Sequence, residues 1–471
     1  MDGEELLPDL VRSYREANAR AVDRYRGADA PRLLLLTSSL GSGHVRAAQA
    51  VHAALLDRAP SASAETVDFW SLMDECVAEA GRDTYLRVVQ DRSDLHDRLY
   101  RLDQGTWRHI FQSSKPLPDA VAEVITLFSS IFESHNQQAS RNGRFGSDRM
   151  LIRRLRDALI GHTAAAANAL LRPALTVWAF TRLAQRLPSR MRAFRPDVIV
   201  ATQMLPAALL SFLKQRGALD TPTIGVLTDF GMHDFWIQPG IDSYCVAHES
   251  VAAPPDAGIA AARVRVTGIP LMPGFQQPPS VEQARRQLGL DPAAPVVLIP
   301  GGGLGIGVDA VAARLASASR AWQIAVVAGR NRAAQQALAA LQTQHRARLR
   351  VWDWTERMEV FMRAADVVVG KPGGLTVAEA MACGRPLVVA QGLRGQEGFN
   401  VRFLEAHGIG GLVREEGLAA HIESLISDPA RLAQIQQRSS ELGRRDGAER
   451  IADLALELAR SPLAKRAAAH R

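Results

Sequence analysis

Cysteine and lysine are both scarce in this 471-residue sequence. The three cysteines, Cys76, Cys245 and Cys383, stand far apart and form neither a CxxC pair nor a zinc-binding spacing. This pattern excludes a disulfide scaffold and a cysteine-based metal site, and it indicates a reducing compartment. Only four of the 56 basic residues are lysine, so arginine carries most of the positive charge behind the net charge of +7.

The sequence also lacks a long uncharged apolar segment, and we expect no signal peptide. Residues 1–30 are charged and are typical of a polar helix. The longest stretch of low charge, Ala158–Phe180, still contains a histidine, an asparagine, an arginine and a proline, which makes it a poor membrane-spanning helix. We therefore expect a cytoplasmic protein, and its length predicts two or three domains.

Short β-branched runs alternate with helical patterns in two series. The first series comprises Arg32–Thr37, Asp197–Thr202, Thr223–Asp229, Ser243–His248 and Val264–Gly268. The second series comprises Pro295–Pro300, Gln323–Gly329, Arg348–Trp354, Asp366–Gly370 and Arg385–Ala390. Continuous apolar runs interleaved with helices are typical of parallel sheets covered on both faces. We predict an α/β protein with two Rossmann-like, doubly wound domains that face each other across a cleft.

The segment Thr267–Ser280, rich in proline and glycine, is interpreted as the interdomain linker. The expected domains are residues 1–270 and residues 271–471, the second ending in C-terminal helices. A basic, mostly helical insertion near 98–195 interrupts the first domain, with 16 basic and six acidic residues. Such an excess is typical of contact with an anionic surface, although a solvated helical face is an alternative. Few aromatics and no recognised binding motif argue against nucleic acid.

The turn after the first predicted strand, LTSSLGSGHVRAA, combines two glycines with a histidine. Gly41 and Gly43 permit a tight turn, and the following helix offers its positive N-terminus to an anion. Arg46 occupies a position where a dinucleotide fingerprint needs a small residue. His44 titrates near neutrality and is a candidate general base, with a helix cap or an exposed histidine as the alternatives.

A second glycine turn, IPGGGLGIGVDA, follows the run Pro295–Pro300. Gly305, Gly307 and Ala310 satisfy the Rossmann spacing. A dinucleotide site would also need an acidic residue after the next strand, but that strand ends in arginines. We interpret the turn as a loop whose N–H groups face a diphosphate, with a flexible structural loop as the alternative.

Three later motifs carry candidate ligands of a sugar nucleotide and its acceptor. In VVVGKPGGLTVAEAMACGRPLVVA, which offers a helix N-terminus, a cation and a carboxylate for ribose, the donor-binding candidates are Lys371, Gly373, Gly374, Thr376 and Glu379. In GLRGQEGFNVRFL, the candidates for sugar hydroxyls are Gln396, Glu397 and Asn400. In LTDFGMHDFWIQ, the candidates for a hydroxylated acceptor are Asp229, His233 and Trp236, which also suit a packed turn.

Five stretches, taken together, resemble the family of monogalactosyldiacylglycerol synthases and processive diacylglycerol glucosyltransferases. They are LTSSLGSGHVRAAQA, LTDFGMHDFW, VTGIPLMPGF, KPGGLTVAEAMACGRPLVV and GQEGFN. Their order and spacing also match, and the resemblance covers most of Arg32–Leu425. It implies a GT-B fold and an inverting, metal-independent transfer of a hexose from a UDP-sugar to a lipid hydroxyl, first of all that of diacylglycerol. A more distant resemblance is to the transferase that adds N-acetylglucosamine to the lipid-linked peptidoglycan precursor.

The same resemblance implies roles for individual residues. His44 takes the place of the catalytic histidine, and Asp229 that of an acidic residue near the acceptor, with Gly41, Gly43, His233 and Trp236 on the same side. The donor-side residues are Gly302 and Gly303 for the diphosphate, Trp354 and Thr355 for the uracil, Glu379 for the ribose, and Gln396, Glu397 and Asn400 for the sugar. No cofactor is expected, because the UDP-hexose is a co-substrate. No metal is expected either, because glycine N–H groups and helix dipoles can stabilise the leaving UDP and no DxD motif follows a strand. The expected partners are a lipid acceptor and the anionic inner face of the cell membrane.

Three other functions remain open at this point. A UDP-sugar 2-epimerase shares the expected architecture, and a non-catalytic UDP-sugar sensor would bind the same ligand without transfer. A nicotinamide-dependent oxidoreductase rests on Gly305–Ala310 alone. The donor sugar is also open, because glucose and galactose differ at one stereocentre.

Overall fold

The structure is a computed structural model. It describes residues 30–39, 42–72, 186–215, 217–232, 236–251, 259–303, 305, 307–318, 321–390 and 398–460. Several expectations lie outside these residues: the N-terminal helix, most of the basic insertion, and the site candidates Gly41, His233, Gln396 and Glu397. Among the helices that it does describe, none has the length and apolar character needed to cross a bilayer.

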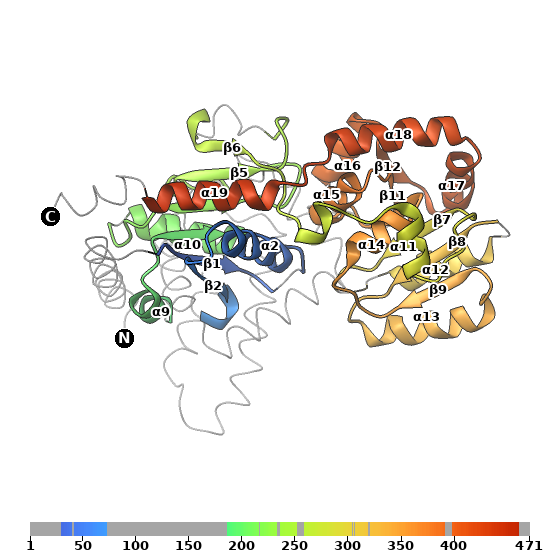
Figure 1. Cartoon of the computed structure of the whole chain (residues 1–471), viewed down its shortest axis with the longest axis horizontal. Helices are drawn as coiled ribbons and strands as arrows, with labels where there is room; N and C mark the ends of the chain where they lie inside the picture. The colour runs from blue at the N-terminus through green and yellow to red at the C-terminus, as the bar shows by residue number, and fades with distance from the viewer. Residues whose placement is uncertain are drawn as a thin grey trace, which may run out of the picture.

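The N-terminal domain is built on a six-stranded parallel sheet in the order β2-β1-β3-β4-β5-β6 (Figure 1). Its strands are β1 (Arg32–Thr37), β2 (Ser63–Asp68), β3 (Val198–Ala201), β4 (Thr223–Val226), β5 (Ser243–Val246) and β6 (Val264–Val266). The four leucines of β1 are fully buried, and they alternate between the hydrophobic clusters on the two faces of the sheet. A strand buried on both faces explains why its sequence has no polar alternation.

The C-terminal domain repeats this architecture with the order β12-β11-β10-β7-β8-β9, again all parallel. Its strands are β7 (Val296–Pro300), β8 (Gln323–Val327), β9 (Leu349–Trp352), β10 (Val367–Gly370), β11 (Leu387–Ala390) and β12 (Gly410–Val413). The predicted pair of doubly wound α/β domains is thus confirmed. The edge strands β2 and β12 were absent from the prediction.

Helices cover both sheets. The N-terminal domain has α2 (Ser42–Arg58), η2 (Phe69–Leu72), α9 (Leu187–Phe194), α10 (Met204–Gln215) and η6 (Ala261–Arg263). The C-terminal domain has α11 (Val281–Gln287), α12 (Val308–Ser317), α13 (Arg332–Gln344), α14 (Met358–Ala364), α15 (Gly374–Ala382), α16 (Gly398–Ala406), η8 (Glu415–Gly417), α17 (Leu418–Ile426) and α18 (Pro429–Leu442). The capping box at Ser280, in which Ser280 and Gln283 bond each other's main-chain N–H, starts α11 at the end of the linker.

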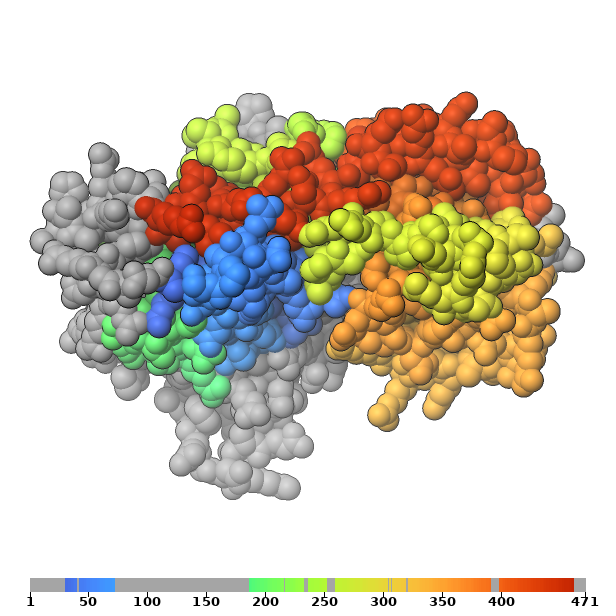
Figure 2. Space-filling model, in the orientation of Figure 1, coloured from blue at the N-terminus to red at the C-terminus, as the bar shows by residue number. Residues whose placement is uncertain are grey.

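The chain passes between the domains twice. The first passage is the predicted linker, which contains η7 (Pro273–Phe275), and the second runs from α18 into α19 (Gly447–Arg460). Helix α19 returns to the N-terminal domain and packs along α2, as Figure 1 shows and as the red and blue atoms show in Figure 2. The two passages touch, because a Cβ at Gly447 would stand 2.9 Å from the main-chain oxygen of Ile269. Residues on both sides of position 270 therefore build the N-terminal domain.

Candidate active site

Both sheets have a point at which successive crossovers leave in opposite directions. In the N-terminal sheet this point lies between β1 and β3, and in the C-terminal sheet between β7 and β10. Ligands of doubly wound sheets bind at the carboxyl ends of the strands beside such a point. The loops that follow these four strands and β4, together with the first turns of α2 and α15, hold most of the predicted site residues that the structure describes.

His44 lies in the first turn of α2, and its ring is oriented by the neighbouring strand loops. Its Nδ1 is 2.9 Å from the main-chain oxygen of Thr202, after β3, and 3.2 Å from Oγ1 of Thr228, after β4. The Thr202 hydroxyl in turn donates to the main-chain oxygen of His44 at 3.1 Å. Because a carbonyl can only accept, the proton of the neutral ring is on Nδ1, and Nε2 is the nitrogen that can take up a proton.

The charge state of the His44 ring also suits a base. Burial lowers the pKa of His44 below 6.5, against the opposing effects of the Asp229 carboxylate and of the bond to Thr202. The ring is therefore neutral at pH 7. A neutral imidazole whose Nε2 has no partner among the described residues has the form that general-base catalysis requires.

Asp229 lies beside His44 in the loop after β4. Burial raises its pKa, while a hydrogen bond from Asn400 and the electrostatic interaction with His44 lower it. The carboxylate of Asp229 and the ring of His44 thus interact electrostatically.

Asn400, predicted as a sugar contact, is fully buried in α16. Its Nδ2 donates to Oδ1 of Asp229 at 2.9 Å and to the main-chain oxygen of Pro372 at 2.8 Å. Its Oδ1 accepts from the main-chain N–H of Phe230 at 2.7 Å. The side chain therefore joins the C-terminal domain to the loop that carries Asp229.

The predicted diphosphate loop follows β7. Gly302 has φ +60°, a conformation that favours glycine, and a Cβ there would meet nothing within 4 Å, so its main chain is open to a ligand. Gly303 lies against α2, because a Cβ there would stand 2.7 Å from Cβ of Ser42. The loop that would hold a diphosphate is thus in contact with the residue two positions before His44.

The N-terminus of α15 is the second predicted anion site. Gly373 is its N-cap, Gly374 its first residue, and Lys371 and Thr376 flank this start. A Cβ at Gly374 would stand 1.7 Å from the main-chain oxygen of Thr228, so α15 meets the loop after β4 main chain to main chain. Helix N-termini of this kind favour negative charge.

The predicted nucleoside side lies after β9 and on α15. The guanidinium of Arg330 stacks over the ring of Trp354 at 4.2 Å from its centroid, and Oγ1 of Thr355 accepts a bond from the main chain of Arg357 at 3.0 Å. Burial raises the pKa of Glu379 to about 8. The charge of Glu359 adds to this rise, and the charge of Arg46 opposes it. With this pKa, the carboxyl group of Glu379 is largely protonated at pH 7.

Sequence patterns missed several contributors. Arg46 reaches from α2 across to the C-terminal domain, where its Nη2 donates to the main-chain oxygen of Glu356 at 2.9 Å. The only sign of Arg46 in the sequence was that it stands where the dinucleotide fingerprint needs a small residue. Thr202 and Thr228 act through a carbonyl and a hydroxyl that no motif identifies, although both follow predicted strands and the carboxyl-end rule could have indicated them.

Two acceptor-side candidates have different surroundings. Gly43 lies in the first turn of α2, and a Cβ there would meet nothing within 4 Å. Trp236 is 4 % exposed and packs against Gly225 of β4, so most of its surface is used in the hydrophobic core. No group of three or more histidine, cysteine, aspartate or glutamate side chains is arranged for a metal ion within the described part of the chain.

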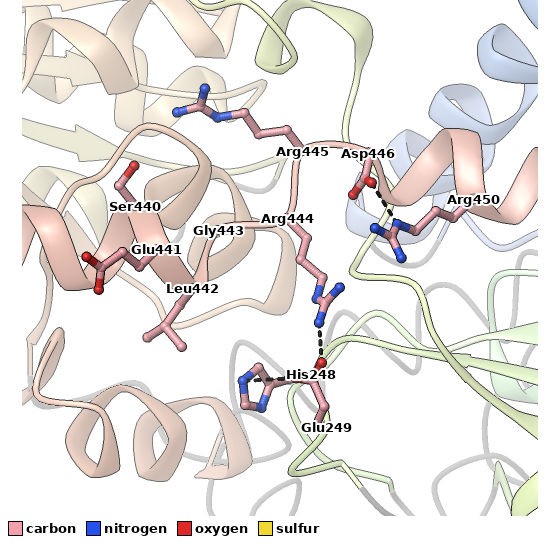
Figure 3. Close-up of a pocket in the computed structure, with 10 residues that line it drawn as sticks. All are labelled: His248, Glu249, Ser440, Glu441, Leu442, Gly443, Arg444, Arg445, Asp446 and Arg450. Atoms are coloured by element: carbon pink, nitrogen blue, oxygen red, sulfur yellow. Dashed lines mark hydrogen bonds and ion pairs between the residues drawn. The ribbon is translucent and has the colours of Figure 1, made fainter.

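A separate cavity of about 620 Å³ lies beside the second passage between the domains (Figure 3). Its wall includes His248 and Glu249 after β5, the end of α18 and the segment 443–446. Its arginines have partners: Arg444 pairs with Glu249, Arg450 with Asp446, and Arg445 with the main-chain oxygen of Ala382. These contacts tie the second passage to both domains.

Comparisons with known proteins agree with this geometry. A family model for monogalactosyldiacylglycerol (MGDG) synthase matches residues 169–271, and one for glycosyl transferases group 1 matches residues 301–428. The processive diacylglycerol β-glucosyltransferase of Bacillus subtilis (strain 168) is 30% identical over 262 residues, which is 55% of this chain and 68% of that protein. Its namesake in Bacillus cytotoxicus is 30% identical over 277 residues, 58% of this chain and 71% of that protein.

Two solved structures share the fold. MurG of Acinetobacter baumannii superposes with a TM-score of 0.52 at 14% identity, covering 91% of this chain and 100% of that one. The glycosyltransferase of kitacinnamycin superposes with a TM-score of 0.50 at 16% identity, covering 92% and 100%. The two parallel sheets and their helices are thus those of the GT-B fold.

Proposed function

The chain belongs to the family of monogalactosyldiacylglycerol synthases and processive diacylglycerol glucosyltransferases, and from this premise we propose that it transfers a hexose from a UDP-sugar to the hydroxyl of diacylglycerol. It is a GT-B glycosyltransferase. The C-terminal domain holds the UDP-sugar, and the N-terminal domain presents the acceptor and the base. The product is a membrane glycolipid.

Transfer takes place in a single displacement. Nε2 of His44 accepts the proton of the acceptor hydroxyl while the hydroxyl oxygen bonds to the anomeric carbon. The bond from that carbon to the UDP oxygen breaks, and its electron pair leaves with UDP, so the anomeric configuration inverts. Asp229 stabilises the imidazolium that forms, and the Thr202 carbonyl keeps the ring in the tautomer that the step requires.

The leaving diphosphate gains negative charge. The groups proposed to stabilise it are the main-chain N–H groups of Gly302 and Gly303, the N-terminus of α15 and the side chain of Lys371. This set of donors can act without a metal ion, so we propose metal-independent transfer. Initial rates after dialysis against EDTA should equal those with added magnesium, and a loss that magnesium restores would contradict this part of the proposal.

The contact between Ser42 and Gly303 carries the proposal. It places the first turn of α2, where His44 lies, against the loop predicted to bind the diphosphate of the donor. This proximity supports a shared site in which the anomeric carbon lies between the proposed base and the proposed leaving group.

His44→Ala tests the assignment of the base. We expect turnover to fall by about 10²- to 10⁴-fold, because general-base catalysis contributes that much, while UDP affinity in calorimetry stays unchanged. His52→Ala is the matched control, because His52 lies on the same helix and bonds Oγ1 of Thr66 at 2.9 Å. Wild-type turnover in His44→Ala would remove His44 from the mechanism.

We propose that the protein reaches its lipid acceptor by binding to the surface of the membrane, at the anionic inner face of the cell membrane. Nucleic acid is not a proposed partner. The support is the net charge of the basic insertion near 98–195, each basic side chain near an anionic leaflet contributing about 1 kcal/mol. Flotation with phosphatidylglycerol vesicles should exceed flotation with phosphatidylcholine vesicles and fall with salt. Equal binding to both kinds of vesicle would contradict the proposed membrane contact.

Mass analysis of glycolipids formed from UDP-glucose and UDP-galactose identifies the sugar that is transferred. Release of a free epimerised sugar in the absence of an acceptor would instead favour an epimerase.

A further inference from the structure

Asn400 uses both hydrogens of its side-chain amide within the protein. One is donated to Oδ1 of Asp229 at 2.9 Å and the other to the main-chain oxygen of Pro372 at 2.8 Å. Its oxygen accepts from the N–H of Phe230 at 2.7 Å, and the residue is 0 % exposed. An amide placed this way has no N–H left to donate to a sugar hydroxyl.

These bonds join the two domains. Asn400 and Pro372 belong to the C-terminal domain, in α16 and in the loop after β10, whereas Asp229 and Phe230 follow β4 in the N-terminal domain. The junction is closely packed on both sides of the amide. The side chain of Phe399 packs against Gly231, since a Cβ at Gly231 would stand 2.2 Å from Cγ of Phe399. The ring centroids of Phe230 and Phe403 are 4.3 Å apart.

The apolar surroundings make the bond to Asp229 important for its charge. A carboxylate removed from water needs hydrogen-bond donors or an opposite charge to remain ionised. Burial raises the pKa of Asp229, and among the described residues Asn400 and, from α2, His44 oppose the rise. Of the other elements at this junction, α15 contributes main chain at Gly374, and the loop after β10 carries Lys371 next to Pro372.

We propose that Asn400 is a positioning residue that holds Asp229 as an ionised carboxylate beside His44. Because the amide belongs to the donor domain and the carboxylate to the acceptor domain, the proton-accepting pair is complete only when the two domains are in contact. The inference rests on the proposed function and adds to it a structural reason why the base becomes fully active in the closed enzyme.

Asn400→Asp is the principal test. It keeps the shape of the side chain and an acceptor for the Phe230 N–H, but it removes the donor to Asp229 and adds a second carboxyl group. Two neighbouring carboxyl groups share a proton, so the fully deprotonated pair of His44 and Asp229 forms only at higher pH. The acid limb of the profile of kcat/KM against pH should move upward by about one unit, and kcat at pH 7 should fall about 10- to 100-fold, the loss expected for a hydrogen bond to a charged group. KM for the UDP-sugar should stay within about twofold.

Rates are measured with UDP-glucose or UDP-galactose and dispersed dioleoylglycerol, and they are expressed per mole of protein that binds UDP in calorimetry, so that unfolded protein is not counted. Asn400→Ala provides a second variant, with the same direction expected in both readouts. Gln342→Glu is the matched control, since this amide accepts a main-chain bond from Val351 at 2.6 Å elsewhere in the C-terminal domain, and it should leave the profile unchanged.

The alternative role, a direct sugar contact, gives the opposite pattern. The Asn400 variants would then raise KM or change the preference between UDP-glucose and UDP-galactose while the acid limb stayed in place, and either result would overturn the inference. An inactive wild-type protein would instead refute the proposed function. The two failures are therefore distinguishable.

Discussion

Replacing Gly374 by alanine tests whether close contact between the domains is needed for transfer. A Cβ at this position would stand 1.7 Å from the main-chain oxygen of Thr228 and 2.7 Å from its carbonyl carbon. Ordinary contact begins near 3.4 Å, so the start of α15 and the loop after β4 must separate by roughly 1.7 Å. Because both groups are main chain, no side chain can turn aside to relieve the overlap.

The expected effect is on alignment rather than on the stability of the C-terminal domain. Alanine is favoured over glycine within a helix by about 1 kcal/mol, so α15 itself is not weakened. A misplacement of about 1 Å between reacting groups costs on the order of 100-fold in rate. We therefore expect Gly374→Ala to lower kcat by about 100-fold or more, while UDP binding persists because residue 374 keeps its N–H.

The assay measures initial rates of glycolipid formation and, in parallel, UDP affinity by calorimetry. Gly417→Ala is the control, because Gly417 caps α17 and a Cβ there would meet nothing within 4 Å. If Gly374→Ala turns over as fast as the wild type, the domains need not approach this closely during transfer, and the reasoning from their contact is refuted.

Three further predictions concern the nucleoside side and the base. Since burial raises the pKa of Glu379 to about 8, the affinity for UDP in calorimetry should rise by about tenfold from pH 7 to pH 9 and then level off, and Glu379→Gln should abolish this dependence. Arg46→Gln removes the cation that opposes the rise, so the dependence should move to higher pH, whereas Arg58→Gln on the same helix, which loses only an exposed ion pair, should not move it. Thr228→Val removes one partner of Nδ1 of His44 and should lower turnover about fivefold without changing UDP affinity; an unchanged rate would show that the Thr202 carbonyl alone orients the ring.

The central strands could be predicted because their apolar runs are short and are separated by helical patterns. Runs such as Leu33–Leu36 have no polar position, and a strand covered on both faces buries every residue of such a run. Two of the four edge strands, β2 and β12, could not be predicted in the same way. The residues of β2 are mostly half-buried and mix polar with apolar types, because one side of an edge strand meets solvent or loops.

Candidate site residues could be proposed from the sequence where chemistry is concentrated in one side chain. His44 and Asp229 are 185 positions apart in the sequence, yet both follow strands of one parallel sheet, and the carboxyl ends of such strands lie together. The contribution of Thr202 could not be read from its residue type, because its main-chain oxygen makes the contact. The burial of Trp236 depends on Gly225 in the neighbouring strand, and no local pattern reports that neighbour.

Within the described residues, the two passages of the chain between the domains meet at a joint where Gly447 lies against Gly268. Gly268 has φ +88°, and a Cβ at Gly447 would be 3.1 Å from the carbonyl group of Gly268. If the angle between the domains changes about this joint, atoms at the joint move least, and atoms farther away move in proportion to their distance from it. A side chain at either position would push the passages apart, so we expect it to change the angle between the domains, although neither glycine belongs to the proposed chemistry.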